Sequence, residues 1–272
     1  MRSLYLSAHD ACLRWHETAG DGPPVLALPG LSFPAVGVFL PVATRGALRD
    51  RRWILADYLG SGASDWRARP LAGLDDDADC MAALLDHLDC GPCAVVGHSM
   101  GGSVGIALAL RRPDLVAHLV VAEANLLPGG GAATRRIAAH DADRFAAEEF
   151  PAMLARRRAA ARAGDAAAAF VAGAWAHADP RALHANSRAL VDLPAGFLDA
   201  FLALAIPRAF FYGARTHPDA TGAPAPDAPD PEPLRAAGVR VAVIPDCGHD
   251  MTTENPAGFA AALVAELDRG AG

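Results

Sequence analysis

Short, nearly continuous apolar runs recur along the 272-residue chain and alternate with longer segments whose apolar residues are spaced as on one face of a helix. The short runs are typical of strands that are buried on both faces of a parallel sheet. They lie at 25–28, 53–56, 94–96, 118–122 and 209–212. The clearest helical spacing spans Leu74 to Leu88, with three aspartates in the first turn, where the helix dipole favours negative charge. The alternation predicts an α/β fold, a mostly parallel central sheet flanked by helices.

Both ends of the predicted sheet have patterns of their own. Residues 4–7 and 12–16 alternate apolar and polar positions on either side of Asp10, which predicts an antiparallel hairpin at a sheet edge. The C-terminal part predicts a helix at 233–237, a strand at 239–244 and a last helix at 256–267. A short helix is also expected at 42–48.

The stretch between residues 129 and 204 differs from the rest of the chain. It is rich in alanine and arginine, has helical spacing and contains no buried-strand pattern. We therefore predict a helical cap subdomain at 129–204, inserted into a core domain formed by 1–128 and 205–272. The arginine run between Arg156 and Arg162 is interpreted as a solvated helix face, because acidic residues surround it.

Composition narrows the classes of function. The net charge is −7 and provides no field that attracts nucleic acid or an anionic membrane surface. All 24 basic residues are arginine, so neither a Schiff-base lysine nor the lysine of a phosphate-binding P-loop is available. The five cysteines form no disulfide framework, and neither a signal peptide nor a membrane-spanning stretch is seen. We expect a cytoplasmic protein that acts on a small molecule.

The strongest chemical signal is a Gly-x-Ser-x-Gly pattern around Ser99. Three apolar residues at 94–96 precede it, and a helix-like segment at 104–110 follows it. This order predicts a strand, a sharp turn and a helix, with glycines at 97 and 101 that let the helix lie close to the strand. A serine held on such a turn presents its hydroxyl above the edge of the sheet and can act as a nucleophile.

Together with two other motifs, this pattern resembles the α/β-hydrolase superfamily over nearly the whole chain. The other motifs are Asp57-x-x-Gly60-x-Gly62-x-Ser64 and the Gly248-His249-Asp250 segment that follows the last predicted strand. The resemblance implies that Ser99 is the nucleophile and His249 the general base. It also implies an oxyanion hole formed by the backbone N–H groups of Met100 and Leu31, although Pro29 stands where family members usually have histidine.

The third member of the implied triad, the acid, has two candidates. Many relatives carry an aspartate in a Gly-x-x-Asp pattern after the strand that follows the cap, but here Gly213 leads to Thr216 at that position, and Asp219 lies three residues further on. Other members of the superfamily place the acid at the end of the strand after the nucleophile helix, where this chain has Glu123. A carboxylate among apolar neighbours is costly unless it meets a cation or a histidine N–H, so we favour Glu123 over Asp219.

These features predict a serine hydrolase that cleaves an ester or lactone bond of a small, largely apolar substrate through an acyl-enzyme. The alternatives are carbon–carbon bond hydrolysis or acyl transfer on the same triad, and a ligand-binding homologue without turnover. No cofactor is expected, and no residues have the spacing of metal ligands. Candidates for lining an apolar pocket are the aromatic residues Phe33, Phe39, Trp175 and Phe197.

Overall fold

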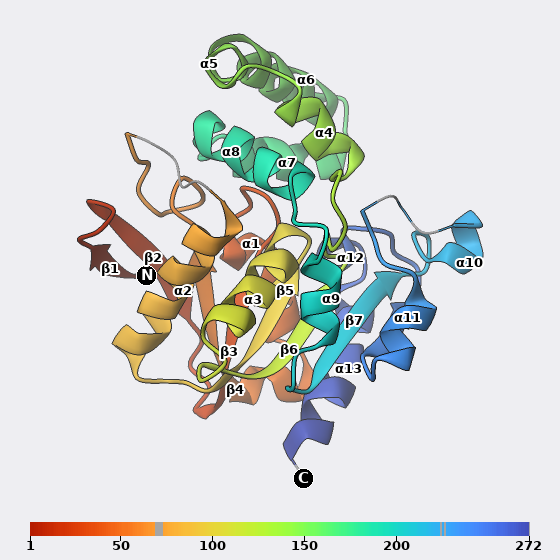
Figure 1. The fold of residues 1–272 in the computed structure, drawn as a ribbon. Coiled ribbons are helices and arrows are strands. Elements are labelled where there is room, and N and C mark those ends of the chain that lie inside the picture. Colours follow the sequence, from red (N-terminus) through yellow and green to blue (C-terminus); the bar gives the residue numbers. More distant parts are fainter. Residues whose placement is uncertain (69–72, 224, 226, 272) are drawn as a thin grey trace.

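A computed structural model describes residues 1–68, 73–223, 225 and 227–271, and any part of a predicted range outside these positions is not described. Within them the chain forms an eight-stranded sheet in the order β1-β2-β4-β3-β5-β6-β7-β8 (Figure 1). The first two strands pair antiparallel, β2 pairs antiparallel with β4, and every other neighbouring pair is parallel. The strands are β1 (Arg2–Leu6), β2 (Ala11–Glu17), β3 (Gly22–Leu28), β4 (Arg51–Asp57), β5 (Cys93–His98), β6 (Val116–Ala122), β7 (Arg208–Gly213) and β8 (Arg240–Ile244).

Helices cover both faces of the sheet. One face carries α2 (Leu74–Leu88), α3 (Met100–Arg111), α9 (Phe197–Leu202) and α11 (Pro231–Ala236). The other face carries α1 (Ala35–Ala43), α12 (Met251–Glu254) and α13 (Pro256–Leu267). Successive strand residues point to opposite faces, so Val95 joins the core under α2 and α3, whereas Val96 joins the core under α1 and α13. The continuous apolar runs of the sequence arise from this burial on both faces.

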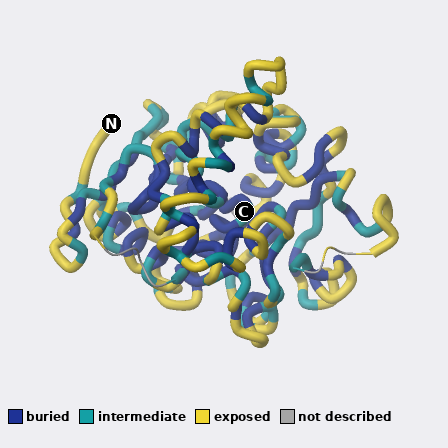
Figure 2. The backbone as a smooth tube through the Cα atoms, turned by 90° about the horizontal axis from the view of Figure 1, so that it is seen from above, coloured by how far each residue is buried: buried dark blue, intermediate teal, exposed yellow. Residues whose placement is uncertain are grey.

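A group of helices lies above the carboxyl-terminal ends of the strands (Figure 1). It consists of α4 (Ala132–Ala138), α5 (Ala142–Arg144), a π-helical turn (Phe145–Glu149), α6 (Phe150–Arg162), α7 (Ala166–Trp175) and α8 (Pro180–Val191). This helical segment has a small apolar core of its own around Phe145 and Leu183. The next helix, α9, falls inside the predicted cap range but packs on the sheet through Phe197 and Phe201. Buried residues fill the middle of the molecule, and exposed residues lie around its rim (Figure 2).

One predicted helix is wrong. The helix expected at 42–48 is replaced by α1, which ends at Ala43, and by a 3-10 turn (Gly46–Asp50). The buried positions Ala35, Val38, Phe39 and Val42 have helical spacing, but Pro41 interrupts the pattern in the sequence. Pro41 cannot donate a backbone hydrogen bond to Gly37, yet α1 continues to Ala43 because its apolar face is buried. The remaining short elements are α10 (Pro218–Thr221) and a C-terminal 3-10 turn (Asp268–Ala271).

The predicted Gly-rich loop after β4 is held by Asp57. One carboxylate oxygen accepts the backbone N–H of Ala35 at 2.7 Å, and the other accepts that of Ala63 at 2.8 Å. Asp57 thus ties the start of α1 to this loop and serves the scaffold. No helix in the described ranges is long and apolar enough to cross a membrane.

Asp77 is a buried carboxyl group between α2 and α8. Asp77 is 1% exposed, and one of its carboxyl oxygens has no hydrogen-bond partner among the described residues. Burial raises its pKa to about 8, the charge of Asp76 adds to the rise, and a hydrogen bond with Asn186 opposes it. Asp77 is therefore protonated in the folded protein at neutral pH, whereas an aspartate in the unfolded chain is ionised.

We predict that Asp77→Asn stabilises the protein progressively as the pH rises from about 4 to about 8. The folded pKa of Asp77 lies above the unfolded value, so the folded wild type binds an extra proton in this window and loses stability with rising pH. The free energy of unfolding of the variant should gain up to about 1.4 kcal/mol per pH unit relative to the wild type. Urea unfolding at several pH values measures this difference, and a difference that stays constant with pH would contradict the prediction.

Candidate active site

The turn between β5 and α3 places Ser99 above the end of the sheet. Its φ of 54° and ψ of −124° are strained values for a residue with a side chain. Both flanking positions must be glycine, because neighbouring backbone atoms lie too close to leave room for a Cβ. A Cβ added at Gly97 would lie 2.3 Å from the carbonyl oxygen of Gly101, and one at Gly101 would lie 2.0 Å from that of Leu28. The predicted strand, sharp turn and helix are therefore present around this serine.

Glu123 follows β6 directly and faces His249 from the neighbouring loop. Its Oε2 lies 3.5 Å from His249 Nδ1, an ion-pair distance that is longer than a strong hydrogen bond. Its Oε1 accepts hydrogen bonds from the backbone N–H of Gly213 at 2.8 Å and from the Thr216 hydroxyl at 2.6 Å. Thr216, at the position where many relatives of the resembled family carry the acid, thus donates a hydrogen bond to Glu123.

The electrostatics of this pair favour the charged forms of both side chains. Burial acts to raise the pKa of Glu123, whose side chain is 8% exposed, but the nearby His249 imidazole and hydrogen bonds from Thr216 and Gly213 outweigh it and lower the pKa. For His249, burial acts to lower the pKa, and the nearby carboxylate of Glu123 outweighs it and raises the pKa. A proton taken up by His249 is therefore stabilised by Glu123.

The other candidate acid, Asp219, lies outside this arrangement. Its side chain is 93% exposed and contacts His217 Nδ1 at 3.4 Å. It does not line the cavity that contains Ser99, Glu123 and His249. The structure therefore brings the predicted serine, histidine and glutamate together and leaves Asp219 on the surface.

The two backbone N–H groups predicted for the oxyanion hole border the same turn. Met100 is the first residue of α3, so its N–H has no acceptor within the helix. Leu31 lies in the loop after β3 and lines the cavity with Ser99. Among the described turns, loops and helix caps, neither amide donates to a backbone carbonyl.

His98 has a contact that the sequence did not reveal. Its Nε2 lies 2.7 Å from the backbone carbonyl oxygen of His249, and because a carbonyl only accepts, this nitrogen carries the proton. Burial, with the nearby charge of His249, lowers the pKa of His98 to about 4, so the ring is neutral at pH 7. His98 thus anchors the loop that carries His249. Its position beside the serine was the only signal in the sequence.

One group of potential metal ligands occurs within the described residues. Ligand atoms of His98, His249 and Asp250 lie within 4.8 Å of one another. The Nε2–H of His98 is already engaged with a carbonyl, which leaves this nitrogen no lone pair for a metal ion. A metal ion held by this group would therefore have to bind Nδ1 of His98.

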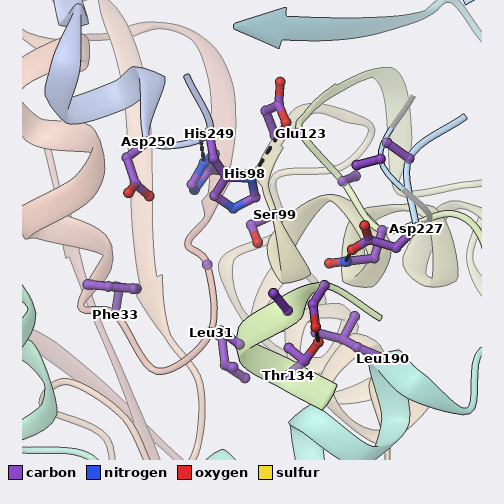
Figure 3. A pocket seen from close by; sticks show the side chains of 18 of the residues that line it. Leu31, Phe33, His98, Ser99, Glu123, Thr134, Leu190, Asp227, His249 and Asp250 are labelled. Atoms are coloured by element: carbon purple, nitrogen blue, oxygen red, sulfur yellow. Dashed lines mark hydrogen bonds and ion pairs between the residues drawn. The ribbon is translucent and has the colours of Figure 1, made fainter. Parts of the chain in front are cut away.

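A cavity of about 380 Å³ lies between the turn of Ser99 and the helical segment. Figure 3 shows Ser99, His249 and Glu123 together on one wall, with Thr134 and Leu190 of the helical segment across from them. Apolar side chains contribute much of the lining, among them Leu31, Phe33, Ile137, Val171, Trp175 and Leu190. Of the predicted aromatic residues, Phe33 and Trp175 do line the cavity. Phe39 and Phe197 do not, since they belong to the cores on the two faces of the sheet.

A model of the alpha/beta hydrolase family matches residues 25–262. The chain therefore belongs to this family. The sheet order and the flanking helices agree with that assignment.

Individual relatives are named as hydrolases of several kinds. The chain is 40% identical to lipase LipV of Mycobacterium tuberculosis over 52% of its own length and 48% of that protein. It is 41% identical to the putative carbamate hydrolase RutD of Pantoea ananatis over 26% of each chain. The matches thus span about half or less of these curated relatives.

Solved structures share the fold over almost the whole chain. A thermophilic esterase from Thermogutta terrifontis superimposes with a TM-score of 0.76 and 22% identity, covering 99% of both chains. The enol-lactonase of Burkholderia xenovorans also has a TM-score of 0.76, with 17% identity, and covers 98% of this chain and 100% of the other. At these identities the likeness concerns the fold. Together the comparisons support a hydrolase.

Proposed function

We propose that the protein is a serine hydrolase that cleaves ester or lactone bonds of small, largely apolar substrates through an acyl-enzyme on Ser99. The observation that carries the proposal is the meeting of Ser99, His249 and Glu123 in one cavity, with the serine on a strained turn. Relatives named lipase and esterase support the same class of reaction.

In this mechanism the Ser99 Oγ attacks the carbonyl carbon of the substrate while His249 takes the hydroxyl proton. The carbonyl oxygen becomes an oxyanion, and the N–H groups of Leu31 and Met100 stabilise it. When the carbon–oxygen bond breaks, His249 gives its proton to the departing alkoxide. Water then attacks the acyl-serine, with His249 again accepting a proton and returning it to Ser99.

Glu123 and the helical segment supply the surroundings for this chemistry. Glu123 stabilises the imidazolium that forms when His249 is protonated, since its carboxylate is buried, ionised and 3.5 Å from Nδ1. The helical segment acts as a cap, because its residues close the cavity opposite Ser99 with apolar side chains. A small substrate with an apolar body fits these walls.

The test measures hydrolysis of two sets of neutral substrates with increasing acyl length. One set is 4-nitrophenyl esters and the other is lactones. The wild type should hydrolyse at least the short and medium members, and Ser99→Ala should not. Circular dichroism on both proteins shows whether they are folded. A folded wild type that cleaves no member of the panel would contradict the proposed reaction and favour carbon–carbon bond cleavage, acyl transfer or ligand binding.

A further inference from the structure

Arginines without a partner gather in the helical segment. Elsewhere in the described chain most arginines meet a carboxylate, as Arg112 does with Asp86 and Asp114. The structure gives no side-chain hydrogen bond or ion pair to five arginines of this segment, and the only other such arginine in the described chain is Arg269, near the C-terminus. The five are Arg136, Arg156, Arg157, Arg158 and Arg162. Like charges this close in one segment repel each other, so their gathering is unfavourable unless an anion is bound.

Three of these arginines surround a hollow of about 300 Å³. Arg136 comes from α4, and Arg156 and Arg157 come from α6, with Met153 and Ala160 between them. We call this the arginine hollow. Two of its residues, Arg136 and Arg157, also line the cavity that contains Ser99. The hollow therefore adjoins the catalytic cavity on the side of the helical segment.

The arginines at this junction are exposed donors with no protein acceptor among the described residues. A guanidinium group has five N–H donors and no acceptor, and its planar fork matches a carboxylate. Trp175 lines the same cavity, and its indole N–H is buried with no partner among the described residues. An anionic ligand group would satisfy these donors and remove the repulsion between the arginines.

Acidic residues of the cavity lie on other elements. Glu123 faces His249, and Asp227 accepts a hydrogen bond from the Asn125 amide. Asp250 follows His249 on the loop after β8. Glu123 and Asp250 come from loops beside the serine. Asp227 lies nearer the helical segment, since a Cβ built on Gly131 at the start of α4 would lie 3.1 Å from its Oδ2. Arg136 and Arg157 thus form a cationic part of the lining on the side of the helical segment.

We propose that the arginine hollow binds a carboxylate of the substrate, so that the enzyme prefers esters or lactones whose acyl chain ends in a carboxylate. The apolar walls would take the methylene groups between the two ends, and the reacting carbonyl would lie at Ser99. This inference rests on the proposed function, from which it takes ester or lactone hydrolysis, and it adds the class of substrate.

The experiment compares mono-4-nitrophenyl esters of glutaric, adipic and suberic acid with neutral 4-nitrophenyl esters of equal chain length. For at least one length, kcat/KM of the wild type should be about tenfold higher for the carboxylate ester than for its neutral match. Arg136→Gln and Arg157→Gln should each lower this ratio about tenfold, and added salt should lower it too. Arg162→Gln is the matched control, because helical periodicity places Arg162 on the opposite face of α6 from Met153, and it should leave the ratio unchanged.

Two results would overturn the inference without contradicting the proposed serine hydrolase. One is a kcat/KM ratio of carboxylate to neutral ester of one or less at every length. The other is an Arg162→Gln variant that lowers this ratio as much as Arg136→Gln and Arg157→Gln do. A binding measurement distinguishes the proposed carboxylate site from the proposed reaction. Monomethyl adipate should bind Ser99→Ala in calorimetry, and adding Arg157→Gln should weaken that binding about tenfold. If the wild type cleaves no ester but this arginine-dependent binding remains, the reaction is wrong and the carboxylate site stands. Binding that is absent, or that is unchanged by Arg157→Gln, rejects the site.

Discussion

Ser99→Ala and His249→Ala are each expected to remove nearly all ester hydrolysis, with kcat falling by about 10⁴-fold or more. Without the hydroxyl no acyl-enzyme forms, and without the imidazole the serine loses its general base. Initial rates with the best neutral ester measure the loss, and equal thermal unfolding of the variants serves as the control.

The double variant gives the sharper result. Residues that act as one unit are not additive, so Ser99→Ala/His249→Ala should be little worse than either single variant. Two losses that multiply would mean that the serine and the histidine act in separate steps, and the shared mechanism would then be wrong.

Glu123→Gln should lower kcat by about 10²-fold to 10⁴-fold and change KM little. A neutral amide no longer stabilises the imidazolium of His249. The carboxylate of Glu123 also raises the pKa of His249, and a general base works only when it is deprotonated. The acidic limb of the kcat/KM profile should therefore move to lower pH in the variant, which a loss of structure alone would not produce.

Asp219→Asn is the matched control for this prediction. Asp219 is exposed and lies outside the cavity, so its amide variant should keep wild-type kcat and an unchanged pH profile. The opposite outcome, a large loss with Asp219→Asn and a silent Glu123→Gln, would assign the acid to the surface loop and reverse our preference.

Much of the fold could be predicted because its central strands are buried on both faces. The runs at 25–28, 94–96 and 209–212 are continuous for that reason, and each lies inside a strand of the structure. The helix expected from Leu74 to Leu88 has those bounds. The helix α1 was missed because Pro41 and nearby glycines look like a break, whereas tertiary burial of its apolar face holds the helix through Pro41.

The candidate site was predictable only where short motifs carry it. Ser99 and His249 belong to local patterns, and Glu123 follows from its place at the end of a strand. The contacts of His98 with the His249 carbonyl and of Thr216 with Glu123 join residues that are 151 and 93 positions apart. Nothing in the local sequence specifies such pairs, since only the folded sheet brings the loops together. The arginine hollow is a further case. The arginines of α6 are exposed, as the sequence predicts, but only the fold brings Arg136 of α4 to the same hollow.

Covalent labelling tests the central claim most directly. A fluorophosphonate reacts with a serine only when the hydroxyl is activated, and peptide mapping by mass spectrometry locates the adduct. We predict one adduct on Ser99 of the wild type, slow labelling of His249→Ala and none at this site in Ser99→Ala. A folded wild type that stays unlabelled, or that carries its adduct on another residue, would contradict an activated nucleophile at Ser99.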